Sequence, residues 1–240
     1  MSDLQKAKGV KGVVDIVFLI DATGSMSPCI EALKNNIQTF VEGLTAKDAN
    51  NASPVKDWRA KVVGYRDCDV DAQPFIDNPF VGTAGELRAQ LTGLTADGGG
   101  DEPESLLEAL FKVANMPSTP KGAPPDPYAW RHKPAAARVV VIFTDATYKE
   151  PLADPKGATF DDVAHVLQNN RIILSIFAPE LACYDKLRTI DKAEWNIVRG
   201  DENPQKALAL FTADQANFRE TLKQLAKTVT AEAIAEKLPD

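Results

Sequence analysis

The sequence predicts an α/β fold: an open, mostly parallel, doubly wound sheet with helices on both faces. Two observations predict it. Short apolar runs rich in β-branched residues, such as Val13–Ile20 (VVDIVFLI) and Arg138–Phe143 (RVVVIF), are typical of strands buried on both faces of a parallel sheet. Amphipathic segments with apolar side chains at helical spacing lie between such runs, and this alternation indicates parallel strands joined by helices.

The first strand, Val13–Ile20, stops at Asp21, and a turn over residues 22–26 follows it. Ser27 and then Pro28 fit an N-cap and a first helical position. Apolar residues then recur at helical spacing, and they are Ile30, Leu33, Ile37, Val41 and Leu44. The chain therefore begins with a strand, a loop and an amphipathic helix.

The same alternation continues to the end of the chain. By the same patterns, further strands are expected at residues 60–65, 74–82, 138–143, 172–178 and around 195–198. Helices are expected at residues 84–94, 105–113, 160–169, 183–191 and 218–229. Because no composition shift divides the chain, we expect an N-terminal tail at residues 1–12 and one domain over residues 13–238.

Residues 116–137 hold six of the 16 prolines and are expected to form an extended, proline-rich insertion at the surface. The run from Tyr128 to Lys133 interleaves aromatic and basic groups, and two interpretations stay open for it. The patch could dock a partner protein, since Tyr, Trp and Arg are frequent at energetic hot spots. Alternatively, the insertion lies over the protein's own surface with Trp130 as its anchor.

Charge and composition exclude several classes of function. The chain has 27 Lys and Arg against 34 Asp and Glu, a net charge of −7, which argues against a general nucleic-acid or anionic-membrane binder. The three cysteines lie far apart, and the N-terminus carries no apolar run typical of a signal peptide. We therefore expect a reduced, cytoplasmic protein without a membrane span.

Hard oxygen donors follow the predicted strands. The first strand delivers Asp21, Thr23 and Ser25 in D-x-T-x-S spacing, and the strand at residues 138–143 is followed by Asp145. Ligands of open α/β sheets bind beyond the carboxyl ends of the strands, where the strand order reverses. Two hydroxyls and several carboxylates there suit Mg²⁺, with Mn²⁺ or Ca²⁺ as alternatives, whereas zinc is disfavoured because His and thiolate donors are missing.

At three places the chain resembles a known family. DATGSM after a buried strand, GGGDEPES before a helix and FTDA after a later strand are similar to the three parts of the metal-ion-dependent adhesion site of von Willebrand factor A domains. The resemblance covers residues 13–229. With GYRDCD at residues 64–69, it is strongest to the A domains associated with alpha-type protein kinases and to other intracellular bacterial A domains. It implies a Rossmann-like fold and a metal-dependent protein-interaction module that is not an enzyme.

The resemblance also implies a ligand set. Thr23 and Ser25 would hold Mg²⁺, with Asp21 and Asp145 binding directly or through water, and an acidic side chain of a partner protein would occupy an open position. The family's middle-loop threonine is matched here by Asp101, with Thr95 as the alternative. A third carboxylate would weaken the pull of the ion on an incoming carboxylate, so a neutral oxygen or water is the alternative occupant.

Other interpretations compete with the metal site. The small polar residues after the first strand could merely cap the next helix, and Asp101 could complement a helix dipole, in a metal-free scaffold. An enzyme of haloacid-dehalogenase type, transferring phosphoryl groups with Mg²⁺, also has an Asp at the end of its first strand. Its proton donor would be an Asp two residues later, where this chain has Thr23.

The acidity of the chain is concentrated at one end of the predicted sheet. Nine acidic residues are assigned there, with Arg66 the only base inside the segments that carry them, and they are Asp21, Asp67, Asp69, Asp71, Asp97, Asp101, Glu102, Glu104 and Asp145. Asp67 is a candidate for a hydrogen bond that supports the metal ligands from outside. The simpler interpretation of its loop is a solvated turn near the site. Without a metal ion, this end should be the least stable part of the protein.

Overall fold

The fold is built around one six-stranded sheet. A computed structural model describes residues 12–100 and 102–235. Its strands are β1 (Val13–Asp21), β2 (Asp57–Tyr65), β3 (Phe75–Asp77), β4 (Ala137–Phe143), β5 (Ile172–Pro179) and β6 (Ala193–Val198). They lie in the order β3-β2-β1-β4-β5-β6, and every pairing is parallel except that of β2 with β3. The predicted α/β fold class with a mostly parallel sheet is confirmed.

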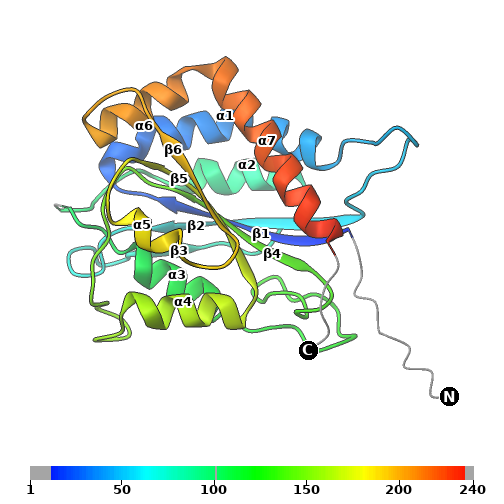
Figure 1. Cartoon of the computed structure of the whole chain (residues 1–240), viewed down its shortest axis with the longest axis horizontal. Helices are drawn as coiled ribbons and strands as arrows, with labels where there is room; N and C mark the ends of the chain where they lie inside the picture. The colour runs from blue at the N-terminus through cyan, green and yellow to red at the C-terminus, as the bar shows by residue number, and fades with distance from the viewer. Residues whose placement is uncertain (1–11, 101, 236–240) are drawn as a thin grey trace.

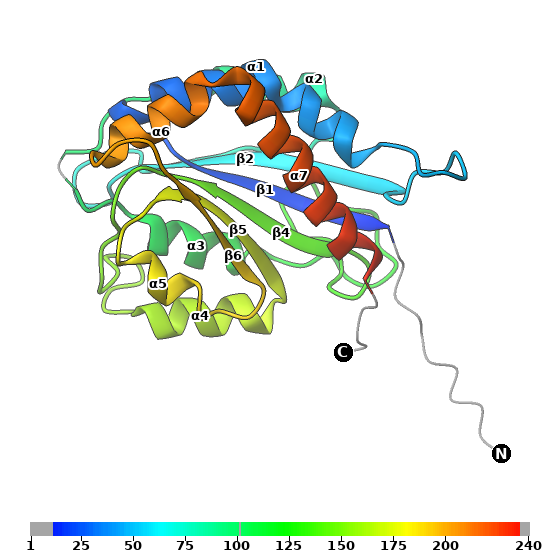
Figure 2. The same ribbon diagram turned by 45° about the horizontal axis from the view of Figure 1, so that its top comes forward.

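Helices cover both faces of the sheet (Figures 1 and 2). One face carries α1 (Ser27–Leu44), α2 (Ala84–Gly93), α6 (Pro204–Ala213) and α7 (Gln215–Ile234). The other face carries α3 (Leu106–Ala114), α4 (Phe160–Asn169) and α5 (Tyr184–Leu187). None of the helices in the described ranges is long and apolar enough to cross a membrane.

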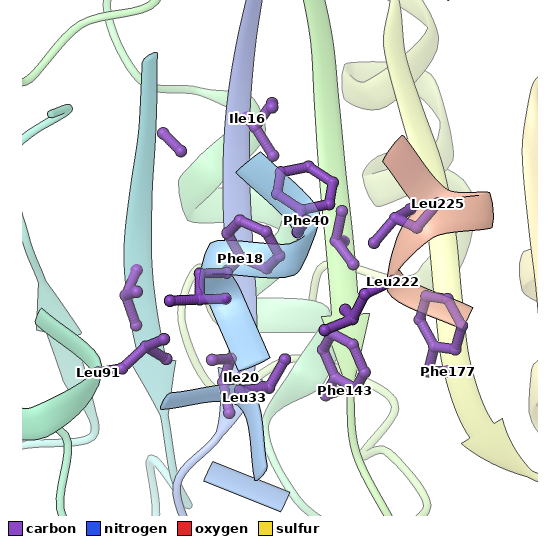
Figure 3. Close-up of a cluster of buried hydrophobic side chains, with 14 of the residues drawn as sticks. Ile16, Phe18, Ile20, Leu33, Phe40, Leu91, Phe143, Phe177, Leu222 and Leu225 are labelled. Atoms are coloured by element: carbon purple, nitrogen blue, oxygen red, sulfur yellow. The ribbon is translucent and has the colours of Figure 1, made fainter. Parts of the chain in front are cut away.

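Two buried clusters hold these layers together, one on each face of the sheet. In β1, Phe18 and Ile20 point into the cluster beneath α1 and α7, whereas Val17 and Leu19 point into the opposite cluster. Figure 3 shows the first cluster, where Phe18 meets the ring of Phe40 edge-on at a centroid distance of 5.3 Å. Alternate side chains of a central strand therefore serve both cores, which explains the nearly continuous apolar run of β1.

Three elements differ from their predictions. Helix α6 was not predicted, although the sequence carries its start signal: Pro204 lies in the first turn, and the Asn203 side chain accepts a hydrogen bond from the amide of Lys206. Strand β3 pairs antiparallel with β2, and it is only three residues long because Pro74 and Pro79 on either side of it cannot donate to a ladder. Helix α1 begins at Ser27, so the prediction of Ser27 as an N-cap is wrong by one position.

The proline-rich segment at residues 116–137 is anchored by Trp130. This side chain is fully buried, and its indole nitrogen donates to the carbonyl oxygen of Val113 at 2.9 Å. Its backbone pairs with the chain near Ser118, whereas Tyr128 remains exposed. The segment is therefore packed against its own domain through Trp130, as the second of the two interpretations states.

A buried ion cluster fixes the same segment to the start of the sheet. The Asp15 carboxylate, near the start of β1, has no exposed surface and accepts from the Arg59 guanidinium at 2.7 and 2.8 Å. It also accepts from the backbone amide of Arg131 at 2.7 Å and from the Arg131 guanidinium at 2.9 Å. Arg131 reaches the exposed Asp57 at 2.8 Å as well. One carboxylate thus joins β1, β2 and the proline-rich segment.

We expect Asp15→Ala to lower the free energy of unfolding by about 3–5 kcal/mol, because it leaves the buried guanidinium of Arg59 without its counter-ion. Asp57→Ala removes an exposed partner of the same cluster and is the matched control, with an expected loss of about 0–1 kcal/mol. Urea denaturation of both variants measures the difference. Equal losses in the two variants would contradict the structural role assigned to Asp15.

Candidate functional site

The candidate site lies where β1 and β4 end side by side. Ile20 of β1 is paired with Phe143 of β4, so Asp21, the last residue of β1, and Thr144, directly after β4, lie side by side at this edge of the sheet. The chain runs from β1 to β2 on one side and later returns to β4 on the other, which makes this the point where strand order reverses. Crevices at such points are the usual ligand sites of open α/β sheets.

Asp21 is the centre of the hydrogen bonding here, and its side chain is fully buried. One carboxylate oxygen accepts from the backbone amide of Thr23 at 3.0 Å and from the Thr23 hydroxyl at 2.7 Å. The other accepts from the Thr144 hydroxyl at 2.9 Å. Thr144 was not predicted as a site residue, although its position directly before Asp145 in FTDA was a usable signal. These bonds fix the turn after β1 against the end of β4.

Asp145 carries a buried oxygen without a partner. Its Oδ1 accepts from the Ser25 hydroxyl at 3.1 Å, and Ser25 lies in the short 3₁₀ turn Gly24–Met26 that leads into α1. Its Oδ2 is buried and has no hydrogen-bond partner among the described residues. An orphaned buried carboxylate oxygen is costly, so native proteins seldom keep one without a ligand, ion or water.

The glycine-rich loop before α3 lies against this site. Gly99 has a φ of +81°, and a Cβ at this position would lie 2.6 Å from Cγ2 of Thr23 and 2.9 Å from Oε1 of Glu104. Only glycine allows both the left-handed backbone and this close approach. Glu104 is buried, and within the described part of the chain its Oε2 also lacks a hydrogen-bond partner. Glu104 was placed at this end by the sequence but was not predicted as a site residue.

The loop after β2 supports the glycine loop from outside. Asp71 accepts hydrogen bonds from the amides of Asp67 and Gly99, at 3.1 and 3.0 Å. Asp67 is buried rather than solvated, and Lys149 bridges it to Asp69 with contacts of 2.6 and 2.7 Å. Lys149 is a base that the sequence analysis did not assign to this end. The loop is therefore a hydrogen-bonded support for the site, as the alternative interpretation of Asp67 proposes.

Burial and mutual repulsion raise the pKa values of these carboxyl groups. Burial, reinforced by the charge of Asp21, raises the pKa of Asp145 to about 6. Burial and the charges of Asp21, Asp67 and Asp71 raise the pKa of Glu104 to about 8. The pKa of Asp21 is also raised by burial, against the opposing effect of its hydrogen bonds from Thr23 and Thr144. The site is thus short of positive charge.

The structure brings together four of the five predicted ligands. Asp21 with Thr23 and Ser25 with Asp145 form two hydrogen-bonded pairs at one edge of the sheet. Asp101 lies outside the described residues. The alternative to it, Thr95, accepts a hydrogen bond from the Arg66 guanidinium at 3.3 Å, so its hydroxyl already faces a cation.

The donor set fits a hard cation that takes hydroxyl as well as carboxylate oxygens. Within residues 12–100 and 102–235, no three His, Cys, Asp or Glu side chains are arranged to hold a metal ion by themselves. Thr23 and Ser25 would therefore have to contribute, and both hydroxyls lie against a carboxylate. The buried Oδ2 of Asp145 supplies an acceptor in need of a positive charge.

Comparison with known proteins gives one relative by sequence. The alpha-protein kinase vwkA of Dictyostelium discoideum is 27% identical to this chain over 168 residues, which are 66% of the chain and 24% of the kinase. The chain thus spans about a quarter of the length of that protein. No protein-family model matches the sequence.

Solved structures share the fold at low sequence identity. The pilus adhesin SpaC from Lactobacillus rhamnosus GG has a TM-score of 0.56 and 12% identity, covering 92% of this chain and 30% of the adhesin. Proximal thread matrix protein 1 from the mussel byssus has a TM-score of 0.56 and 13% identity, covering 95% of this chain and 48% of the matrix protein. These likenesses establish the fold alone.

We expect Gly99→Ala to lower the free energy of unfolding by about 1–3 kcal/mol, because alanine is strained at positive φ and its Cβ would collide with Thr23. Gly24→Ala is the matched control from the neighbouring loop, since a Cβ there meets nothing within 4 Å. Its expected change is within about 0.5 kcal/mol. Chemical denaturation of both variants tests the difference, and a neutral Gly99→Ala would contradict the close approach.

The raised carboxyl pKa values predict how stability depends on pH. The native protein keeps protons on Asp145 up to about pH 6 and on Glu104 up to about pH 8, whereas the unfolded chain releases them near the ordinary pKa values of 3.8 and 4.5. Stability from these groups is complete below the unfolded pKa values and is lost as pH rises through the folded ones. The melting temperature in EDTA should therefore fall between pH 5 and 8. A flat or rising profile would contradict the assignment.

Proposed function

We propose that this chain is a von Willebrand A-type domain that binds a divalent cation. The expected ion is Mg²⁺, with Mn²⁺ or Ca²⁺ as alternatives. In this proposal it serves as a metal-dependent protein-interaction module. Thr23, Ser25, Asp21 and Asp145 would hold the ion, with Asp101 as a further ligand from the glycine-rich loop. The bound ion would supply an electrophilic position that an oxygen of a partner protein can complete.

The single observation that carries the proposal is the orphaned Oδ2 of Asp145. A carboxylate that is buried, that has one oxygen without a partner among the described residues and that lies close enough to Asp21 to feel its charge requires a cation to be stable in its ionised form. The two hydroxyls beside the carboxylates are neutral oxygen donors of the kind that Mg²⁺ and Ca²⁺ accept.

The chain's own residues also support a role without catalysis. Asp21 would be the nucleophile of a phosphoryl-transfer enzyme, yet both of its oxygens accept hydrogen bonds and the side chain is fully buried. The position two residues later, where such an enzyme needs a proton donor, is Thr23, whose hydroxyl donates to Asp21 instead. These contacts orient Asp21 as a fixed acceptor of hydrogen bonds.

The comparisons agree with an interaction module. The similarity to an alpha-protein kinase is in line with the resemblance of DATGSM, GYRDCD and GGGDEPES to A domains associated with such kinases. Two proteins that share the fold are an adhesin and a matrix protein. The crowding of carboxylates at the site favours a neutral oxygen of the partner over an acidic side chain as the last ligand.

Mg²⁺ is expected to raise the melting temperature of the protein at pH 8. At a concentration 100 times its dissociation constant, a ligand adds about 2.7 kcal/mol to the stability, which corresponds to a shift of about 5–10 °C for a chain of this size. Asp145→Asn keeps the shape and the acceptor for Ser25 but removes the buried charge. It should abolish the shift and raise the melting temperature of the metal-free protein by a few degrees.

Glu232→Gln is the matched control, because its carboxylate pairs with Lys192 beside the opposite end of the sheet. This variant should respond to Mg²⁺ like the wild type. Differential scanning fluorimetry with MgCl₂, MnCl₂, CaCl₂ or EDTA measures all three proteins. No shift with any of these ions in the wild type, or an equal shift in Asp145→Asn, would leave a metal-free scaffold as the better description.

A further inference from the structure

An exposed aliphatic side chain lies on the loop beside the candidate site. Val70 is 60% exposed, the highest value among the large apolar side chains in the described part of the chain. Its loop is well fixed, since the amide of Asp69 donates to the Asp67 side chain at 2.9 Å and the amide of Asp71 donates to the Asp67 carbonyl oxygen at 2.9 Å. Fixed loops that present an apolar side chain to solvent lose little entropy on binding.

The glycine-rich loop lies between Val70 and the candidate ligand residues and approaches both. A Cβ at Gly100 would lie 3.4 Å from Val70, and a Cβ at the preceding Gly99 would lie 2.6 Å from Thr23. Asp71, next to Val70, accepts the hydrogen bond from the Gly99 amide. The apolar side chain and the candidate metal site are therefore parts of one continuous surface.

This surface is strongly acidic. Among the described residues, the site and the loops around it contain eight acidic residues and two basic ones, Arg66 and Lys149. The acids are Asp21, Asp67, Asp69, Asp71, Asp97, Glu102, Glu104 and Asp145. With Glu104 protonated and the other groups ionised the net charge is −5, and one divalent ion would leave −3. The nearby pairs Lys186–Glu150 and Arg199–Glu180 are each neutral.

Two of these acids, Asp97 and Glu102, are exposed on the glycine-rich loop. Together with Asp69, Val70 and Asp71 they form what we call the acidic rim. A partner that approached the rim with several carboxylates would be repelled even with the cation bound, whereas a basic surface would be attracted. Apolar contacts surrounded by complementary charges are the usual composition of a specific interface.

We infer that the acidic rim is the docking surface for a protein partner with a basic contact surface that places an apolar side chain against Val70. The inference rests on the proposed function and adds the chemistry of the partner. The cation would lie within the contact, while the surrounding attraction would come from lysine and arginine side chains of the partner.

Fluorescence anisotropy with defined peptides tests the inference. The probes are a short peptide with several arginines around one leucine, the same peptide with glutamates for the arginines, and a third with serine for the leucine. In MgCl₂ at low ionic strength, the arginine–leucine peptide should bind at least about tenfold more tightly than the glutamate peptide. Val70→Ser in the protein, and serine for leucine in the peptide, should each weaken binding by about fivefold to tenfold.

Two controls locate the contact. Tyr128→Ser removes a similarly exposed apolar side chain from the proline-rich segment and should leave peptide affinity unchanged. The paired change Asp97→Asn with Glu102→Gln should weaken binding of the arginine peptide, whereas Glu220→Gln with Glu232→Gln, on α7, should not. Equal effects of the two pairs would show attraction by net charge alone and would overturn the inference.

The same samples separate this inference from the proposed function. The Mg²⁺-dependent shift in melting temperature should be intact in Val70→Ser. If Mg²⁺ stabilises the protein but the glutamate peptide binds more tightly, or Val70→Ser has no effect, the inferred docking surface is overturned and metal binding stands. If Mg²⁺ gives no shift while the arginine peptide binds through Val70, the metal site fails and the docking surface stands.

Discussion

Burial of the Asp21 carboxylate is the constraint on which the rest of this edge depends. A carboxylate removed from water must find hydrogen-bond donors or a positive charge, or it becomes protonated. Asp21 finds donors in the turn that follows it and in Thr144 at the end of β4. The same bonds shape the turn into α1 and fix β4 beside β1. A single buried charge thus organises both loops that carry the candidate ligands.

The neighbouring carboxyl groups are less well compensated. Lys149 forms salt bridges to both Asp67 and Asp69 and also donates its backbone amide to the carbonyl oxygen of Glu104, so it ties three loops together. Among the described residues, its ammonium group makes no hydrogen bond to the orphaned oxygens of Asp145 and Glu104. The ammonium group of Lys149 therefore stabilises the outer carboxylates of this edge. The inner carboxyl groups, Asp145 and Glu104, have no such partner among the described residues.

The sequence predicted the sheet and the edge at which the candidate ligands lie, because both depend on local patterns. Apolar runs identified β1, β4 and β5, and the residues directly after them identified Asp21, Thr23, Ser25 and Asp145. What it could not predict depends on contacts between distant segments. The salt bridge from Lys149 to Asp67 spans 82 residues, and the approach of Glu104 to Thr23 depends on the conformation of Gly99. Helix α6 was missed for a different reason, because the Asn203–Pro204 pair that starts it is a local signal that the sequence does show.

Strand β1 has a buried aspartate toward each end, and their surroundings are opposite. Asp15 is saturated by Arg59 and Arg131, whereas Asp21 lies among other acids. Six residues of strand separate them by about 20 Å. The charges along β1 are therefore asymmetric: Asp15 is compensated at one end, whereas the acids around Asp21 at the other give a field that extends about 8 Å at physiological ionic strength. A charged molecule would be rotated by this field before contact, so the asymmetry acts on the rate and orientation of encounter.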